Sequence, residues 1–257
     1  MISANTIFPV TWSPKRRSGV TIGFAIVGLF AFLWLLPIPL SWVPEPIGSA
    51  AQQFAEGARV TVQLTLVSGL IGIVIGVLAA VAKLSNLAPL RWFGGFYIWV
   101  FRGTPLLIQV MFCYYALPFA WQLSEFNSAV LALSLNVGAY NAEAIRAGIQ
   151  AIHKGQIEAA RSLGLSSFQT FRDVIFPQSF RIALPPLVNN FVSLLKDSSL
   201  AYVIGVVELS NIGNQVKSAS FEPIPVFITT ALIYLILTSI LTLISGAVER
   251  QLDVERH

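Results

Sequence analysis

Residues 60–82 read VTVQLTLVSGLIGIVIGVLAAVA, a run of 23 residues without a single charged side chain. A helix of about 20 apolar residues crosses the hydrocarbon core of a bilayer, so this run predicts a membrane-spanning helix. The whole chain of 257 residues has the same character, with 55% hydrophobic and 11% charged residues and a mean hydropathy of +0.73. This composition excludes a water-soluble globule, a disordered chain and a disulfide scaffold.

Further apolar runs predict a polytopic, all-α membrane bundle. Four are uncharged, and a fifth is interrupted only by Lys196 and Asp197; they are Gly19–Trp42, Gly103–Ser124, Phe126–Ala142, Pro223–Val248 and Ile182–Val207. Hydrocarbon offers no partner to a free backbone amide, so each run is expected to be helical and consecutive helices to alternate in direction. The sequence therefore predicts six spans.

Two of these runs carry ladders of small residues at four-residue spacing. The ladders are Ser68, Gly72, Gly76 and Ala80 in one run, and Ser134, Gly138 and Ala142 in another. Small side chains let helix backbones approach closely inside a bilayer. We expect both ladders to be helix-packing surfaces.

The basic residues indicate the orientation. With both termini in the cytoplasm, thirteen of the sixteen Lys and Arg residues fall on the cytoplasmic side. Arg59 and Lys217 fall outside, and Lys196 falls within a span. Cytoplasmic loops are enriched in Lys and Arg, so this distribution predicts that both termini are cytoplasmic.

The longest cytoplasmic connection, residues 149–181, predicts two short helices. Gly155–Leu163 is rich in helix formers and ends at Gly164, a residue suited to a left-handed cap. Ser166 and Gln169 have the spacing of a capping box, and Pro177 is expected to end the second helix. Such a pair suits either docking to another protein or lying on the membrane surface, and local physics leaves both open.

The residues of this connection resemble the EAA loop of ABC-importer permeases. Glu158, Ala159 and Ala160 are followed at the family's spacing by Gly164 and, further on, by Pro177. Flanking stretches resemble the polar amino-acid branch: Arg102–Leu107, Ala139–Glu143, Lys154–Glu158 and Leu195–Leu200. The resemblance implies an ATPase-coupling loop made by Gly155, Glu158, Ala159, Ala160, Gly164 and Pro177.

The resemblance also implies an architecture and partners. Its expected layout is a cytoplasmic segment (1–18), an extra transmembrane helix (19–42), a five-helix type I importer core (60–249) containing the loop 149–181, and a cytoplasmic tail (250–257). Expected partners are a pair of cytoplasmic ATPase subunits, a second permease that is identical or homologous, an extracytoplasmic solute-binding protein and a polar amino acid, with no nucleic acid. The chain has no G-x-x-x-x-G-K-[ST] motif, so ATP and Mg²⁺ would belong to the ATPase subunits. The expected location is the bacterial inner membrane.

A polar stripe in the fifth run suggests a solute pathway. Asn189, Ser193 and Lys196 recur at helical spacing, with Asn190 and Asp197 one step around. An ionised side chain in mid-membrane faces protein or water rather than lipid. These residues are candidates for the pathway, with anchoring of the helix to its neighbours as the alternative. The family usually has Asn-Glu where this chain has Asn189-Asn190.

Two other functions would make different use of the polar residues. An ion-coupled secondary transporter of a small polar solute would use intramembrane carboxylates, a role open to Asp197 and Glu143. A membrane enzyme fits less well, because His153 and His257 are the only histidines and no set of residues has catalytic or metal-ligand spacing. We therefore expect no catalytic residue, cofactor or metal site in this chain.

Overall fold

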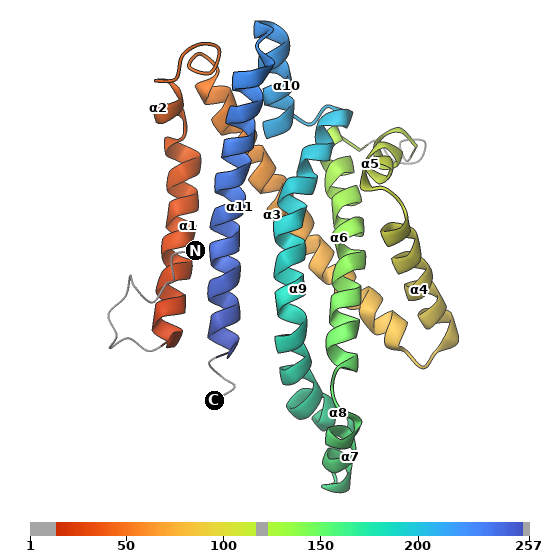
Figure 1. Cartoon of the computed structure of the whole chain (residues 1–257). Coiled ribbons are helices and arrows are strands. Elements are labelled where there is room, and N and C mark those ends of the chain that lie inside the picture. The colour runs from red at the N-terminus through yellow and green to blue at the C-terminus, as the bar shows by residue number, and fades with distance from the viewer. Residues whose placement is uncertain (1–13, 117–122, 254–257) are drawn as a thin grey trace. The chain divides into compact units, whose positions relative to one another are not determined.

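The computed structural model describes residues 14–116 and 123–253, which form helices and no strand. In chain order these are α1 (Pro14–Leu35), α2 (Pro37–Leu40), α3 (Ala51–Leu84), α4 (Ala88–Gly103), α5 (Leu106–Tyr115), α6 (Glu125–Gln150), α7 (Lys154–Ser162), α8 (Ser167–Thr170), the π-helix η3 (Phe171–Ile175), α9 (Phe176–Asp197), the 3₁₀-helix η4 (Ser198–Ile204), α10 (Leu209–Ser220) and α11 (Pro223–Asp253) (Figure 1). The all-α prediction is confirmed. Most of the predicted N-terminal segment 1–18 and half of the tail 250–257 lie outside the described residues.

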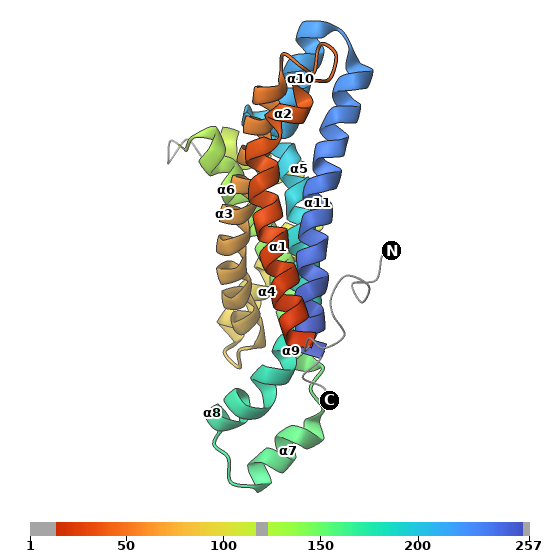
Figure 2. The ribbon, with the colours of Figure 1, turned by 90° about the vertical axis from the view of Figure 1, so that its left-hand side faces the viewer.

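The chain divides into two compact units, one formed by residues 1–55 with 216–257 and the other by residues 56–215. In the first unit α1 and α11 lie side by side and run in opposite directions, as Figure 2 also shows. Both helices expose large apolar side chains, among them Phe24, Val27, Trp34, Ile224, Leu232 and Leu235. A surface of this kind suits contact with lipid acyl chains rather than water.

Three helices in the described part of the chain are long and apolar enough to cross a membrane, namely α1, α3 and α11. A fourth crossing is added if the bent pair α4 and α5 is counted as one. The long helices α6 and α9 are more polar and do not meet this composition test. Six spans remain a prediction in which α6 and α9 cross the bilayer with their polar side chains facing protein or water.

Two of the runs predicted to be spanning helices do not form one continuous helix. The run Gly103–Ser124 is not one helix, because α4 ends at Gly103 and α5 follows at an angle of 106° and ends at Tyr115. Residues 117–122 of this run lie outside the described residues. The run Ile182–Val207 is also divided, since α9 ends at Asp197 and the tighter η4 continues to Ile204. Hydropathy detects apolar stretches but does not register such breaks.

In the second unit, α3 and α6 meet along the two predicted ladders. A Cβ atom added at Gly76 would lie 2.7 Å from the Cβ atom of Asn141 and 3.1 Å from the carbonyl oxygen of Gly138. A Cβ atom added at Gly138 would lie 2.9 Å from Cγ2 of Ile75. The backbones are too close for larger side chains, as expected of small-residue packing between membrane helices.

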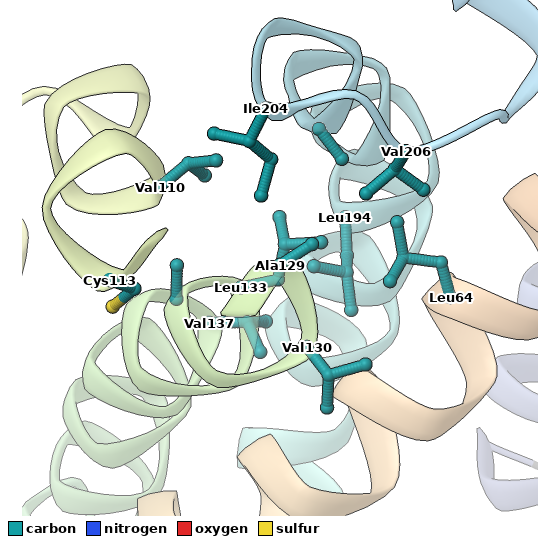
Figure 3. Close-up of a cluster of buried hydrophobic side chains, with 12 residues drawn as sticks. Leu64, Val110, Cys113, Ala129, Val130, Leu133, Val137, Leu194, Ile204 and Val206 are labelled. Carbon is teal, nitrogen blue, oxygen red and sulfur yellow. The ribbon is translucent and has the colours of Figure 1, made fainter. Parts of the chain in front are cut away.

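Buried apolar side chains from α3, α5, α6, α9, η4 and the turn after η4 form a core cluster of the second unit (Figure 3). Those labelled in the figure are Leu64, Val110, Cys113, Ala129, Val130, Leu133, Val137, Leu194, Ile204 and Val206. Because α5 and η4 each contribute to this core, the short elements that follow the two breaks are fixed against α6 rather than left in loops.

Replacing Gly76 by leucine should destabilise the protein by about 1–3 kcal/mol, because the added side chain forces α3 away from α6. The measurement is the midpoint of thermal unfolding in detergent, followed by size-exclusion chromatography after heating. Gly28→Leu on α1 is the control, since no atom lies within 4 Å of a Cβ atom built there. Equal midpoints for the two variants would contradict the close packing.

Candidate functional site

The connection between α6 and α9 begins with α7, which has a defined cap at each end. At its start, Nδ1 of His153 accepts a hydrogen bond from the N–H of Gly155 at 3.2 Å. At its end, Gly164 has φ +80° and its N–H donates to the carbonyl oxygen of Arg161. No atom lies within 4 Å of a Cβ atom built at Gly164, so backbone conformation alone favours glycine there. The predicted glycine cap is confirmed.

The second helical arm starts with the predicted capping box. The N–H of Ser166 donates to Oε1 of Gln169 at 2.9 Å, and the N–H of Gln169 donates to Oγ of Ser166 at 3.3 Å. Each side chain thus satisfies a backbone donor that the helix itself leaves open. The arm consists of α8 followed directly by η3. We call residues 154–175 the α7–α8 hairpin.

Pro177 does not end the second arm, so that prediction is wrong. The helical path runs from α8 through η3 into α9, and Pro177 lies in the first turn of α9. A proline lacks an N–H and crowds the preceding turn of an α-helix. Here the N–H of Phe176 donates to the carbonyl oxygen of Phe171, five residues earlier, and this wider turn precedes the proline.

A close backbone contact holds the base of the hairpin. A Cβ atom added at Gly148, near the end of α6, would lie 2.7 Å from the carbonyl oxygen of Ser179 and 3.0 Å from Cβ of Ala183. Ser179 and Ala183 belong to the first turns of α9 and are buried. Figures 1 and 2 both show α7 and α8 beyond this end of the α6–α9 pair. The hairpin is therefore attached to both long helices.

The hairpin exposes large apolar side chains together with five charged ones. Leu163 is 82% exposed and Phe168 69% exposed. Arg172 and Asp173 pair with each other, Nε to Oδ1 at 2.6 Å, and the Arg172 guanidinium lowers the pKa of the Asp173 carboxyl. Of the predicted coupling residues, the structure exposes Glu158, Ala159, Gly164 and Pro177, half-buries Gly155 and buries Ala160. Apolar side chains in such exposed positions are typical of a binding surface.

A second feature is the break between α4 and α5, where backbone carbonyl groups accept hydrogen bonds from two amide side chains. The Nε2 atom of Gln109 donates to the carbonyl oxygens of Phe101 at 2.9 Å and Thr104 at 3.1 Å. The Nδ2 atom of Asn136 donates to the same Phe101 oxygen at 3.1 Å and to Oε1 of Gln109 at 3.0 Å. Gln109 and Asn136 are themselves buried. Carbonyl groups at the end of α4 that lack a helical partner are thereby satisfied.

An open cavity of about 460 Å³ lies beside this break. Its lining comes from the α4–α5 break, α6, α9 and the start of η4, and consists of Thr104, Pro105, Leu106, Asn136, Val137, Tyr140, Asn190, Ser193, Leu194, Lys196, Asp197 and Leu200. All of these belong to the second unit. A volume of this order, with a mixed polar and apolar wall, is typical of a small-molecule site.

The cavity gathers four of the five predicted pathway residues. Asn190, Ser193, Lys196 and Asp197 line it, whereas Asn189 does not and is exposed on an adjacent part of α9. Nδ2 of Asn190 donates to Oδ1 of Asn141 on α6 at 3.0 Å, so one side chain of the stripe also ties two helices together.

Several residues of the cavity wall were not among those predicted from the sequence. Thr104, Asn136 and Tyr140 come from the α4–α5 break and from α6. Thr104 and Tyr140 lie within stretches that resemble the permease family, and Asn136 lies one helical turn before Tyr140 in a mostly apolar run. The resemblance and the polar residue in an apolar run single out these positions in the sequence. Only the tertiary structure shows that they share a cavity with residues of α9.

Lys196 and Asp197 lie in the last turn of α9, and not in the middle of one helix that spans the whole run Ile182–Val207. A cation in this position interacts favourably with the negative end of the helix dipole. The side chains of Asn189, Ser193 and Lys196 are exposed along one face of α9. This face is too polar to be stable against lipid.

Charged residues next to Tyr140 form ion pairs around one carboxylate, that of Glu143, between α4 and α6. The guanidinium carbon of Arg102 lies 5.2 Å from the centre of the Tyr140 ring, and Nη1 of Arg102 lies 4.0 Å from Oε1 of Glu143. Glu143 also pairs with Arg146 one turn along α6. Tyr140 therefore both lines the cavity and contacts a member of this charged group.

The comparisons with known proteins agree with these features. Residues 72–254 match the family described as binding-protein-dependent transport system inner membrane component. The chain is 41% identical over 199 residues to the arginine transport system permease protein ArtQ and 42% identical over 199 residues to the L-cystine transport system permease protein TcyB, both of Bacillus subtilis (strain 168). These alignments cover 77% of this chain and 91% and 85% of the relatives. A crystal structure of an amino acid ABC transporter with histidines matches with a TM-score of 0.75 and 37% identity, covering 79% of this chain and 95% of that one.

Replacing Gln109 by leucine should destabilise the protein by about 1–3 kcal/mol, because the Thr104 carbonyl loses its donor and the buried amide of Asn136 loses an acceptor. The measurement is again the unfolding midpoint in detergent. Gln215→Leu, at an exposed glutamine of α10, is the matched control. If both variants unfold at the wild-type temperature, the amide contacts do not hold the α4–α5 break.

Proposed function

The chain belongs to the family of binding-protein-dependent transport system inner membrane components, and we propose that it is the permease subunit that carries a polar amino acid into the cytoplasm in an ATP-driven importer. The relatives described above carry arginine or L-cystine in their names, and both solutes are polar amino acids. Membership in this family gives the ion-coupled alternative no support.

The observation that carries the proposal is the α7–α8 hairpin with its exposed apolar surface, at the end of the two helices that line the cavity. The chain has no phosphate-binding loop of its own, so the energy of ATP has to enter through another protein. The hairpin is suited to fill a groove on a cytoplasmic ATPase subunit. A pair of such subunits, with their ATP and Mg²⁺, would press on the hairpins and switch access to the pathway by rigid-body movement.

Two further partners follow from the proposed function. A second permease, identical or homologous, would cover the exposed polar face of α9 that carries Asn189, Ser193 and Lys196. Leaving these side chains against lipid would cost at least about 2.5 kcal/mol for the charged residue alone. A solute-binding protein outside the membrane would deliver the amino acid, as the description of the family implies.

We place both termini in the cytoplasm. The start of α1 and the end of α11 lie at the same end of their antiparallel pair, which supports one side for both. The excess of cytoplasmic Lys and Arg then selects which side it is. The extra helix α1 adds one crossing before the core.

Weakening the hairpin should abolish binding of the ATPase subunit without preventing membrane insertion. Phe168→Ala removes an exposed aromatic contact, and Gly164→Val imposes strain of about 1–3 kcal/mol at a left-handed residue. The measurement is the amount of ATPase subunit that co-purifies with a tagged permease. Phe24→Ala, an equally exposed phenylalanine on α1, is the control. Normal co-purification of both hairpin variants would exclude the hairpin as the docking element.

The orientation can be checked by cysteine labelling in a Cys113→Ala background. A cysteine at Ser166 in the hairpin should react with an impermeant maleimide only after the membrane is opened, because we place the hairpin in the cytoplasm. A cysteine at Ser49, before α3, should react from outside in intact cells. Labelling of position 166 in intact cells would reverse the proposed orientation.

A further inference from the structure

The turn between α3 and α4 carries two basic side chains without an acidic partner of their own. Lys83 lies in the last turn of α3, and Arg91 lies in the first turn of α4. In the described part of the chain neither side chain forms an ion pair or a hydrogen bond. The sequence has no acidic residue from position 57 to position 124, a range that includes both cations. Neighbours in the chain therefore do not neutralise them.

The carboxylate that acts on this turn from another helix is already shared. Glu143 on α6 interacts electrostatically with Lys83, but its oxygen atoms pair with Arg102 and Arg146. Three cations around one carboxylate leave an excess of two positive charges, and Arg91 adds a third. An anion from outside the chain would balance this excess.

Gly95 on α4 brings the two cations together. A Cβ atom added at Gly95 would lie 2.5 Å from Nζ of Lys83, so the ammonium group of α3 rests on the surface of α4 at this residue. Arg91 precedes Gly95 by four residues, and positions i and i+4 are neighbours on one helix face, about 6 Å apart. Two cationic donors at this spacing suit a phosphate group, whose oxygen atoms accept charge-assisted hydrogen bonds.

An exposed aromatic strip runs beside the two cations. Its members Trp92, Phe96 and Trp99 follow one face of α4 at i, i+4 and i+7, and all three are exposed. The ring centres of Trp92 and Phe96 lie 5.4 Å apart, and those of Phe96 and Trp99 lie 6.0 Å apart. Tryptophan is enriched where the headgroups of a bilayer meet its acyl chains. A phosphate on the cations and an acyl chain on this strip would lie side by side along α4.

We propose that the α3–α4 turn binds an anionic phospholipid, with the phosphate between Lys83 and Arg91 and an acyl chain along the aromatic strip. Basic residues between two spans on the cytoplasmic side are typical of sites for anionic lipid headgroups. The cytoplasmic leaflet follows from the proposed orientation, which the labelling of position 166 tests separately. None of the residues of this lipid site lines the cavity or belongs to the hairpin.

The test is lipid binding to the full-length permease in detergent, measured by native mass spectrometry with phosphatidylglycerol and phosphatidylcholine of the same acyl chains. The wild-type protein should bind phosphatidylglycerol about 10-fold more tightly, because two cations face the anionic headgroup. Equal affinities for the two lipids would overturn the proposal. Inorganic phosphate should not compete with phosphatidylglycerol; if it displaces the lipid, the site binds a free anion and the lipid assignment falls.

Three variants test the pair of cations. Lys83→Gln and Arg91→Gln should each lower the affinity for phosphatidylglycerol about 5-fold and leave that for phosphatidylcholine unchanged. Gly95→Ala keeps every charge but places a methyl group where the ammonium group lies, so it should also lower the affinity for phosphatidylglycerol. Arg250→Gln, at an exposed arginine of α11 on the same proposed side, is the control. Wild-type affinity in both glutamine variants, or an equal loss in the control, would exclude the two cations as the site.

A second permease is the other occupant that the aromatic strip could accept. Trp99→Ala should weaken the binding of both lipids, because each loses an acyl-chain contact, and should leave the oligomeric state in size-exclusion chromatography unchanged. Loss of a dimer with unchanged lipid binding would assign the strip to the second permease and overturn the acyl-chain contact.

Discussion

The fold of the second unit depends on hydrogen bonds to the backbone carbonyl groups that lose their helical partners where a helix is broken. Between α4 and α5 the chain turns by 106°, which leaves carbonyl groups at the end of α4 without helical partners. In a hydrocarbon environment each such group costs several kcal/mol unless protein supplies a donor. Gln109 and Asn136 supply the donors, and Asn136 comes from α6. The break is therefore fixed to α6, and the cavity forms beside it.

The same helix links the cavity to the hairpin. α6 contributes Asn136 and Tyr140 to the cavity wall and, at its end, packs through Gly148 against the first turns of α9. α9 starts at the hairpin without interruption and ends in the cavity at Lys196 and Asp197. In the proposed importer, a push on the hairpin would reach the cavity through α9, which continues directly from the hairpin, and through α6, which the short turn 151–153 joins to α7.

Local features of the hairpin could be predicted because they depend on neighbours in the chain. The capping box of Ser166 and Gln169 and the left-handed cap at Gly164 each involve residues a few positions apart. Pro177 was predicted wrongly because its effect depends on the turn before it. A π-helical turn there lets the helix continue, and no residue type in the sequence predicts that turn. The apolar run Ile182–Val207 likewise gives no indication that α9 ends at Asp197 and η4 follows.

The sequence by itself determined the membrane class, the all-α fold, the helix-packing ladders and the resemblance to importer permeases. These properties follow from composition and from short-range spacing, which the chain carries whatever its tertiary arrangement. Only the tertiary structure decided which polar residues share a cavity. Asn190 and Lys196 line the cavity together with Thr104 and Tyr140, whereas Asn189 does not. The distances between these helices depend on close packing at glycines such as Gly138 and Gly148. The spacing of residues within one helix does not encode these distances.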